Sequence, residues 1–235
     1  MSSFEDRLKE KGLPLSPLQN HQFDTYFKTL VHWNEKMNLT AITDQAQVFL
    51  KHFYDSITPA FYFDFNAIAT ICDVGSGAGF PSLPIKILFP QLKVTIIDAL
   101  KKRLAFLEAL SNVCGMDNVE LIHERAELIG RKVGYRGSFD VVTARAVARL
   151  NVLAEYCLPL TKVGGTFIAM KGSDGEAEAE EARRAIGVLG GAIERIERLQ
   201  LPEEEGLRHI IFIKKNQETP KKYPRKPGVP SRQPL

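Results

Sequence analysis

An apolar segment that runs into a glycine-rich loop holds the first residues able to bind a ligand. Residues 71–80 read Ile-Cys-Asp-Val-Gly-Ser-Gly-Ala-Gly-Phe, and a second apolar segment, residues 94–98, ends at Asp98. Because glycine has no Cβ and tolerates positive φ, such a loop lets the backbone approach a ligand closely. An acid at the end of the next strand can accept hydrogen bonds from both ribose hydroxyls of a nucleoside. The two features together indicate a site for an adenosine-containing cofactor.

The spacing of the glycines restricts the choice of cofactor. A dinucleotide-binding loop has its third glycine three residues after the second, whereas Phe80 holds that position here and the third glycine is Gly79. The Gly-Lys-Ser/Thr ending of a phosphate-binding loop is absent. The remaining pattern, acid-x-Gly-x-Gly-x-Gly, resembles the first motif of the class I S-adenosylmethionine (SAM) methyltransferases. A plain strand-to-helix turn is the alternative for a glycine triplet alone, and the placement of Asp98 favours the cofactor.

The resemblance to class I methyltransferases implies roles for several acids and loop residues. Asp73, directly before the loop, would anchor the amino end of SAM while the loop amides approach its methionine portion. Further along, Ala126 and Glu127 match the place where these enzymes recognise adenine, although an acid there is also typical of the first turn of a helix. The expected cofactor contacts are Asp73, Gly75, Gly77, Gly79, Phe80, Asp98, Ala126, Glu127 and Arg145.

The acceptor side is expected where the fourth strand ends, within residues 139–149. That segment contains neither Asn-Pro-Pro-Tyr, which binds an exocyclic amino nitrogen, nor the Pro-Cys nucleophile that attacks carbon 5 of cytosine. Instead Arg145 and Arg149 follow the strand, and Lys171 ends the fifth strand. Solvated arginines at a helix start are the alternative, but cations at a helix N-terminus oppose its dipole. We therefore expect Arg145 and Lys171 to be the catalytic residues.

One acceptor atom in particular can be methylated without a general base. Guanine N7 carries a lone pair and no proton, so its attack on the SAM methyl group needs no general base. Catalysis would come from aligning N7, the methyl carbon and the sulfur, which can contribute ~7 kcal/mol or more. This chemistry predicts a site that positions its substrates.

Composition sets the broad class of the protein. The chain has 235 residues, of which 44% are hydrophobic and 25% charged, as in ordinary soluble globular proteins. Its three cysteines, Cys72, Cys114 and Cys157, form no paired spacing, so we expect neither a disulfide framework nor a metal site. No apolar run reaches membrane-spanning length. These features favour a cytoplasmic protein without a membrane partner, and a monomer is the default expectation.

The basic residues are concentrated at the C-terminus. Residues 215–235 carry six lysines and arginines and one acid, a net charge of +5, whereas the whole chain carries +3, so the other 214 residues sum to −2. Five prolines in the same segment predict an extended rather than helical tail. An extended cationic strip suits a phosphate backbone, and a solvated, disordered terminus is the alternative.

The order of the expected elements indicates an α/β fold with three parts. Apolar residues at helical spacing predict helices over 17–38, 44–55 and 56–63, so residues 1–66 form a helical cap. Residues 67–214 form the SAM-binding core, where strands alternate with crossover helices as in a parallel sheet, and residues 215–235 form the basic, proline-rich tail. Strands are expected near 69–74, 93–98, 119–122, 139–143, 164–170, 193–201 and 208–214, the last two as a hairpin joined by 202–206. Helices are expected near 81–89, 101–114, 125–130, 149–160 and 175–189.

Several segments across the chain are similar to one family. Residues 33–40, 51–56, 73–80, 143–146, 170–172 and 221–228 resemble, in this order, the bacterial ribosomal RNA small-subunit methyltransferase G family. The resemblance implies a Rossmann-like, mostly parallel seven-stranded sheet that closes with an antiparallel hairpin. It also implies SAM-dependent methylation of N7 of one guanine in 16S rRNA, with the rRNA or the small ribosomal subunit as partner. The RNA-side candidates are Asn34, His52, Asp55, Lys221, Lys222, Arg225 and Lys226.

Two other functions stay open at this point. A class I methyltransferase for a small molecule or a protein side chain would not need the basic tail, and its activity would be independent of RNA. A SAM-binding or nucleotide-binding regulator would bind the cofactor without turnover. Because the resemblance covers nearly the whole chain, rRNA methylation ranks first.

Overall fold

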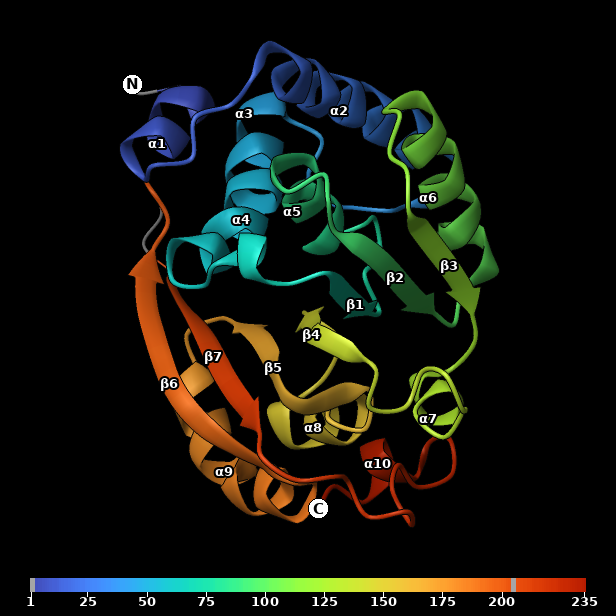
Figure 1. Ribbon diagram of the computed structural model, residues 1–235. Helices are drawn as coiled ribbons and strands as arrows, with labels where there is room; N and C mark the ends of the chain where they lie inside the picture. Colours follow the sequence, from blue (N-terminus) through green and yellow to red (C-terminus); the bar gives the residue numbers. More distant parts are fainter. Residues whose placement is uncertain (1–2, 204–205) are drawn as a thin grey trace.

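A seven-stranded sheet forms the centre of the computed structural model, which describes residues 3–203 and 206–235 (Figure 1). The strands lie in the order β3-β2-β1-β4-β5-β7-β6; the first five run parallel, and β7 lies antiparallel to β5 and β6. The expected sheet with its antiparallel hairpin is confirmed, and the predicted turn at 202–206 lies partly outside the described residues. The strands are β1 (Thr70–Val74), β2 (Lys93–Asp98), β3 (Val119–His123), β4 (Phe139–Arg145), β5 (Thr161–Lys171), β6 (Gly191–Gln200) and β7 (Leu207–Lys215).

Strand register brings residues from distant parts of the chain to one edge of the sheet. Asp98 lies opposite His123 at the ends of β2 and β3, and Arg145 ends the neighbouring strand β4. Lys171 at the end of β5 lies opposite His209 of β7. Between β1 and β4 the chain order reverses, and open α/β sheets bind ligands in the crevice at such a point, outside the carboxyl ends of the strands.

The N-terminal helices cover one face of the sheet together with α5 (Ser82–Leu88) and α6 (Lys101–Val113) (Figure 1). The long helix α2 (Pro17–Met37) begins as predicted: the Ser16 side chain accepts a hydrogen bond from the Gln19 N–H, and Pro17 takes the first position, which needs no amide donor. Its buried side chains recur at three- and four-residue intervals and join the same hydrophobic cluster as the sheet. They are Phe23, Tyr26 and Leu30.

The rest of the N-terminal region is also helical, with two differences from the prediction. Helix α1 (Phe4–Glu10), a short helix whose Leu8 is fully buried, was not predicted from the sequence. The two helices expected over 44–63 form one continuous helical run, because the backbone keeps helical dihedrals through Asp55. This run comprises α3 (Gln45–Val48), the π-helical turn η1 (Phe49–Tyr54), α4 (Asp55–Ile57) and the 3-10 turn η2 (Thr58–Phe61), and a further 3-10 turn, η3 (Phe65–Ala67), leads into β1.

Helices α8 (Leu150–Cys157) and α9 (Gly175–Val188) cover the opposite face of the sheet, with the short helix α7 (Ala126–Ile129) at its side (Figure 1). A second hydrophobic cluster fills the space between these helices and β4, β5 and β7. All five helices expected after residue 80 are present, with ends that differ from the predicted ones by a few residues. No helix in the described part of the chain is long and apolar enough to cross a membrane.

The C-terminal segment packs against this second face. Arg131 donates hydrogen bonds to the carbonyl oxygens of Lys222 and Pro224, and Arg136 donates to those of Thr219 and Tyr223. The prediction of an entirely extended tail is wrong at α10 (Val229–Arg232). There Gly228 turns the chain at a φ of +80°, and Pro230 falls in the first helical turn, where proline is tolerated.

Candidate active site

The loop between β1 and α5 requires glycine at two positions because other atoms lie too close. Gly75, Gly77 and Gly79 have φ values of +74°, +61° and +95°. A Cβ on Gly79 would lie 2.5 Å from Oη of Tyr26, and one on Gly75 would lie 2.8 Å from Cγ2 of Val147. In contrast, nothing among the described residues would lie within 4 Å of a Cβ on Gly77. The backbone at Gly77 is therefore open to a ligand.

Asp73, at the end of β1, is fully buried and has one carboxylate oxygen to spare. Its Oδ2 accepts a hydrogen bond from the Ser82 N–H at 3.1 Å, whereas Oδ1 has no partner among the described residues. Burial raises the pKa of the Asp73 carboxyl to about 7, although the Ser82 hydrogen bonds and the charge of Arg145 oppose the rise. Because a buried acceptor without a donor is costly, an ammonium group, which carries three donors, fits this position.

Asp98, at the end of β2, lies one strand away from Asp73 and is 3% exposed. Its Oδ1 accepts a hydrogen bond from the Leu100 N–H at 2.9 Å, and its Oδ2 lies 3.4 Å from Nη1 of Arg103. The carboxylate thus shapes the turn into α6. An ionised carboxylate offers about four acceptor positions, so these two contacts leave room for ribose hydroxyls, and the ribose contact stays a prediction.

The two residues expected at the adenine lie at the start of α7. Ala126 and Glu127 are both buried. Oε1 of Glu127 accepts hydrogen bonds from Nη2 of Arg125 at 3.0 Å and from the Gly228 N–H at 2.9 Å. Burial raises the pKa of the Glu127 carboxyl, but the hydrogen bonds from Arg125 and Gly228 outweigh this and hold the pKa below its usual value. Glu127 is therefore an ionised acceptor that other protein groups already contact.

Phe80 lies between two rings and a cation. It stacks on Tyr26 of α2 with ring centroids 5.6 Å apart and on His52 with centroids 4.7 Å apart, and the Arg145 guanidinium lies 4.9 Å from its centroid. Tyr26 also donates a hydrogen bond to the Ala78 carbonyl at 2.5 Å. The N-terminal helices thereby hold the glycine loop and its aromatic end in place.

His52 is a weak base in this setting. Burial, and then the positive charge of Arg145, lower the pKa of His52 to about 4, so its imidazole is neutral at pH 7. Its Nε2 lies 2.7 Å from Oγ1 of Thr40, and its Nδ1 is buried without a partner among the described residues. The ring is thus fixed by its stacking and by Thr40.

A cavity of about 300 Å³ opens beside Arg145, between the helical run at 51–58 and the ends of β4, β5 and β7. More cations than acids line it, which favours a ligand with negative charge or with several acceptors. Its charged lining residues are Lys51, Arg145, Lys171, Arg208, Asp55 and Glu178.

Ion pairs hold the cavity's side chains in position. Nη1 of Arg145 lies 2.8 Å from Oδ2 of Asp55. Nε of Arg208 lies 3.3 Å from Oδ1 of Asp55, without the geometry of a hydrogen bond. Lys171 pairs with Glu178 at 2.7 Å. In the described part of the chain, no group of three or more His, Cys, Asp or Glu side chains is arranged to hold a metal ion.

The structure brings together some of the expected RNA-side residues and not others. His52, Arg145 and Lys171 all line the cavity. Asn34 does not line it; its side chain accepts a hydrogen bond from the Thr40 N–H at 2.8 Å and so holds the turn after α2. Arg149, the second arginine after β4, is exposed and pairs with Glu181 of α9.

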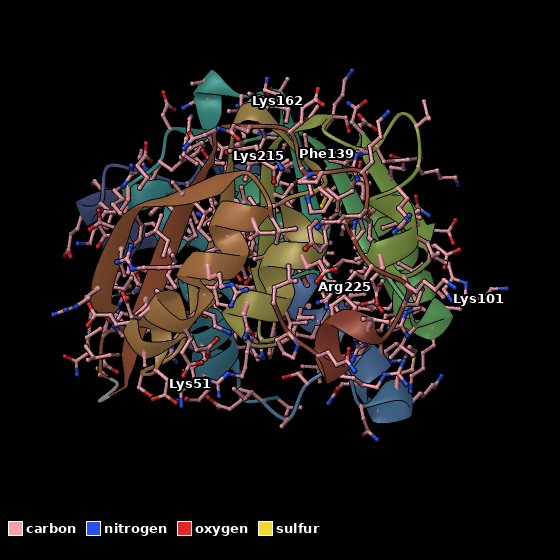
Figure 2. The ribbon with its side chains drawn as sticks, turned by 90° about the horizontal axis from the view of Figure 1, so that it is seen from below. Lys51, Lys101, Phe139, Lys162, Lys215 and Arg225 are labelled. Carbon is pink, nitrogen blue, oxygen red and sulfur yellow. The ribbon has the colours of Figure 1, made fainter. Side chains whose placement is uncertain are left out.

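The basic residues of the tail differ from one another. The side chains of Lys221, Lys222 and Lys226 are exposed, whereas Arg225 forms hydrogen bonds through Nε and Nη2 with the carboxylate of Glu155, a fully buried residue of α8. Figure 2 places Arg225 toward the same end of the molecule as Lys51 and Lys101, and Lys162 and Lys215 toward the opposite end. RNA binding by these tail residues stays a prediction, and Arg225 has a partner within the protein.

Sequence reasoning missed two cations of the cavity, Lys51 and Arg208. Lys51 lies one position before the expected residue His52 on the same helical run. Arg208 lies on β7, which runs antiparallel to β5 and so returns to the carboxyl edge next to Lys171. The predicted hairpin contained this information, because the first residues of a strand antiparallel to β5 must lie beside its end.

Comparison with known proteins gives close relatives of nearly equal length. The family model for rRNA small subunit methyltransferase G matches residues 19–211. The ribosomal RNA small subunit methyltransferase G of Macrococcus caseolyticus is 59% identical over 99% of this chain and 97% of its own length. Its namesake from Bacillus cytotoxicus is 57% identical over the whole of this chain and 98% of its own length.

Solved structures share the fold at low sequence identity. The StiE O-MT structure has a TM-score of 0.54 at 14% identity, over 72% of this chain and 75% of that chain. The 16S rRNA (adenine(1408)-N(1))-methyltransferase from Catenulisporales acidiphilia has a TM-score of 0.51 at 15% identity, over 66% of this chain and 89% of its own. The sheet order and the glycine loop are consistent with the family that the sequence matches indicate. The chain belongs to the rRNA small subunit methyltransferase G family.

Proposed function

We propose that this protein transfers the methyl group of SAM to N7 of one guanine in the 16S rRNA of the small ribosomal subunit. One observation supports this proposal above others. The unpaired carboxylate oxygen of Asp73 lies at the sheet edge where the Arg145 cavity opens, which supports neighbouring sites for a cofactor ammonium and a purine acceptor. The family and its named relatives supply the class of substrate.

On the cofactor side each role follows from the chemistry of the residue. Asp73 accepts hydrogen bonds from the ammonium of SAM, and the open backbone at Gly77 lets the methionine portion approach. Asp98 accepts hydrogen bonds from the ribose hydroxyls, and the turn at 126–127 contacts the adenine. When bound, SAM would supply an electrophilic methyl group from its sulfonium and leave as the neutral thioether S-adenosylhomocysteine, and the protein residues would hold it in line with the acceptor.

On the acceptor side the guanine enters the cationic cavity. Its N7 and O6 are neighbouring acceptors on one edge. The Arg145 guanidinium lies over Phe80 and lines the cavity, and in this proposal it would donate a hydrogen bond to O6. Lys171 and Arg208 add positive charge for the neighbouring phosphates. Because N7 has no proton to lose, the low pKa of His52, about 4, does not impede the reaction.

Around the cavity, exposed basic residues of the tail would contact the RNA backbone through non-specific charge. Lys221, Lys222 and Lys226 are free to do so on account of their exposure. Arg225 and Asn34 would contribute indirectly, by holding the tail and the turn after α2. In this proposal the protein works as a monomer in the cytoplasm, where small subunits are present.

The test is methyl transfer from tritiated SAM to small-subunit RNA or particles from a strain that lacks the gene. We expect label at a single guanine, recovered as N7-methylguanine, and its loss in Asp98→Ala. SAM binding without transfer to RNA or particles would contradict the assignment and favour a regulator or a methyltransferase for another substrate. Naked 16S rRNA and intact particles, tested side by side, identify the form of RNA that is methylated.

A further inference from the structure

The C-terminal segment at 225–232 lies directly against the turn expected to bind adenine. Gly228 donates its N–H to Oε1 of Glu127 at 2.9 Å, and Arg125 donates to the same oxygen at 3.0 Å. The Glu127 side chain is only 3% exposed. Its carboxylate is thus covered, and removal of these donors would leave a buried charge with fewer partners, which is costly.

A second attachment lies just before this contact. The Arg225 N–H, Nε and Nη2 all donate to the Glu155 carboxylate, at 2.6, 2.9 and 2.6 Å. Glu155 is fully buried on α8. A paired arginine fork and carboxylate fix geometry as well as charge. The Arg225 guanidinium therefore fastens the segment to the protein, and its charge is balanced there.

The loop after α7 provides a third attachment. Arg131 donates to the Pro224 carbonyl at 2.7 Å, and Arg136 donates to the Tyr223 carbonyl at 2.8 Å. The segment and the two residues before it are therefore bound to the loop after α7, to Glu127 within α7 and to Glu155 of α8. A backbone held at so many points restricts the motion of what it covers, here the turn at 126–127.

We propose that residues 225–232 are a positioning element for the cofactor: by binding Glu127, they order the turn at 126–127 that contacts the adenine of SAM. This inference rests on the proposed SAM site. Gly228 and Arg225 are then positioning residues, and the Glu127 carboxylate acts through the tail rather than by a contact of its own with the base. The positive charge of the tail gives no hint of this role, because the role depends on a main-chain N–H and on one ion pair.

The first test is calorimetric SAM binding without RNA, by the full chain and by a variant that lacks residues 226–235. We expect the deletion to weaken SAM binding about tenfold, which corresponds to about 1.4 kcal/mol at 25 °C. A second variant, Gly228→Pro, keeps the tail but removes the N–H donor and cannot hold a φ of +80°, so we expect the same loss. The matched control is Gly12→Pro, the same change at an exposed glycine with a φ of +76° in the α1–α2 connection, which should bind SAM as the parent does.

A double-mutant cycle then separates positioning from a direct contact. If Glu127 acts through the tail, Glu127→Ala removes the acceptor and the deletion removes the donor of the same hydrogen bond. The double variant should then bind SAM no more weakly than the weaker-binding single variant. Additive losses of SAM affinity would overturn the proposal and would indicate that Glu127 contacts the adenine itself. Unchanged SAM affinity in both Gly228→Pro and the deletion would also overturn it while leaving the SAM site intact. Failure of the parent protein itself to bind SAM would instead refute the proposed function.

Discussion

The cofactor side and the acceptor side of the candidate site are built in different ways. On the cofactor side, Asp73, the glycine loop and Ser82 lie within ten residues of one another, and they meet through backbone conformation and close packing. On the acceptor side, Asp55, Arg145 and Arg208 come from three distant elements and meet through ion pairs. The first side therefore depends on steric fit, and the second depends on a balance of charges. Substitutions on the two sides should therefore impair the protein in different ways, by steric clash on the cofactor side and by loss of charge on the acceptor side.

The largest expected effect is a steric one, on the cofactor side. In Gly79→Ala the new Cβ would lie 2.5 Å from Oη of Tyr26, at a φ of +95° that alanine adopts poorly. We expect the free energy of unfolding to fall by about 3 kcal/mol, from overpacking and backbone strain together. SAM binding should become undetectable in the same variant. Urea denaturation and calorimetry measure the two effects.

Gly77→Ala is the matched control for this substitution. Its φ of +61° is also positive, but nothing described would lie within 4 Å of the added Cβ. We expect a loss of stability of only about 1 kcal/mol, from strain alone, while SAM binding is still weakened because the methyl group occupies the ligand's approach. Equal losses of stability at Gly77 and Gly79 would show that close packing by Tyr26 does not matter.

The next effect is a pH dependence that comes from Asp73 on the cofactor side. Burial raises the pKa of Asp73 to about 7, well above the ordinary value of 3.8, so the folded protein holds a proton there that the unfolded chain releases. Stability without cofactor should therefore be greatest below pH 4 as far as this group is concerned, and should decline as the pH rises through 7.

SAM binding should show the opposite trend, because its ammonium group requires the ionised carboxylate. We expect the affinity for SAM to fall up to about tenfold for each pH unit below 7 and to level off above pH 8. Calorimetry between pH 5.5 and 8.5 measures this, and Asp73→Asn should bind weakly with no such dependence. The same slope in Asp73→Asn would assign the titration to another group.

On the acceptor side, Arg208→Ala should affect RNA and not SAM. The substitution removes one cation from the cavity and leaves Asp55 paired with Arg145. We expect the KM for small subunits to rise about tenfold, in keeping with one lost charge-assisted contact. The dissociation constant for SAM should not change. An equal change in both constants would mean that the two sides are not separate.

The same contrast explains which parts were predictable from the sequence. The sheet, its hairpin and the Asp73–Gly79 pattern follow from local periodicity and spacing, because neighbouring residues determine them. The cavity was only partly predicted: Arg145 and Lys171 end strands, but Arg208 requires knowledge of how β7 pairs with β5. The contacts of the tail were not predicted, because composition reports its charge and prolines, whereas its contacts with Glu127 and Glu155 depend on the whole fold.

The smallest expected effect concerns the tail lysines. Their substitution should distinguish non-specific attraction by charge from specific contacts with the RNA. Lys221 and Lys222 are exposed, and the Arg131 side chain donates a hydrogen bond to the main-chain carbonyl of Lys222, which alanine retains. We expect Lys221→Ala with Lys222→Ala to raise the KM for small subunits about threefold and to reduce the slope of log affinity against log salt by about 1 to 2. Subunit binding measured between 50 and 300 mM salt tests this. A loss of affinity that persists unchanged at high salt would show that these lysines make specific contacts. The tail would then resemble the acceptor cavity, where individual side chains matter, and would not act as a diffuse cationic surface.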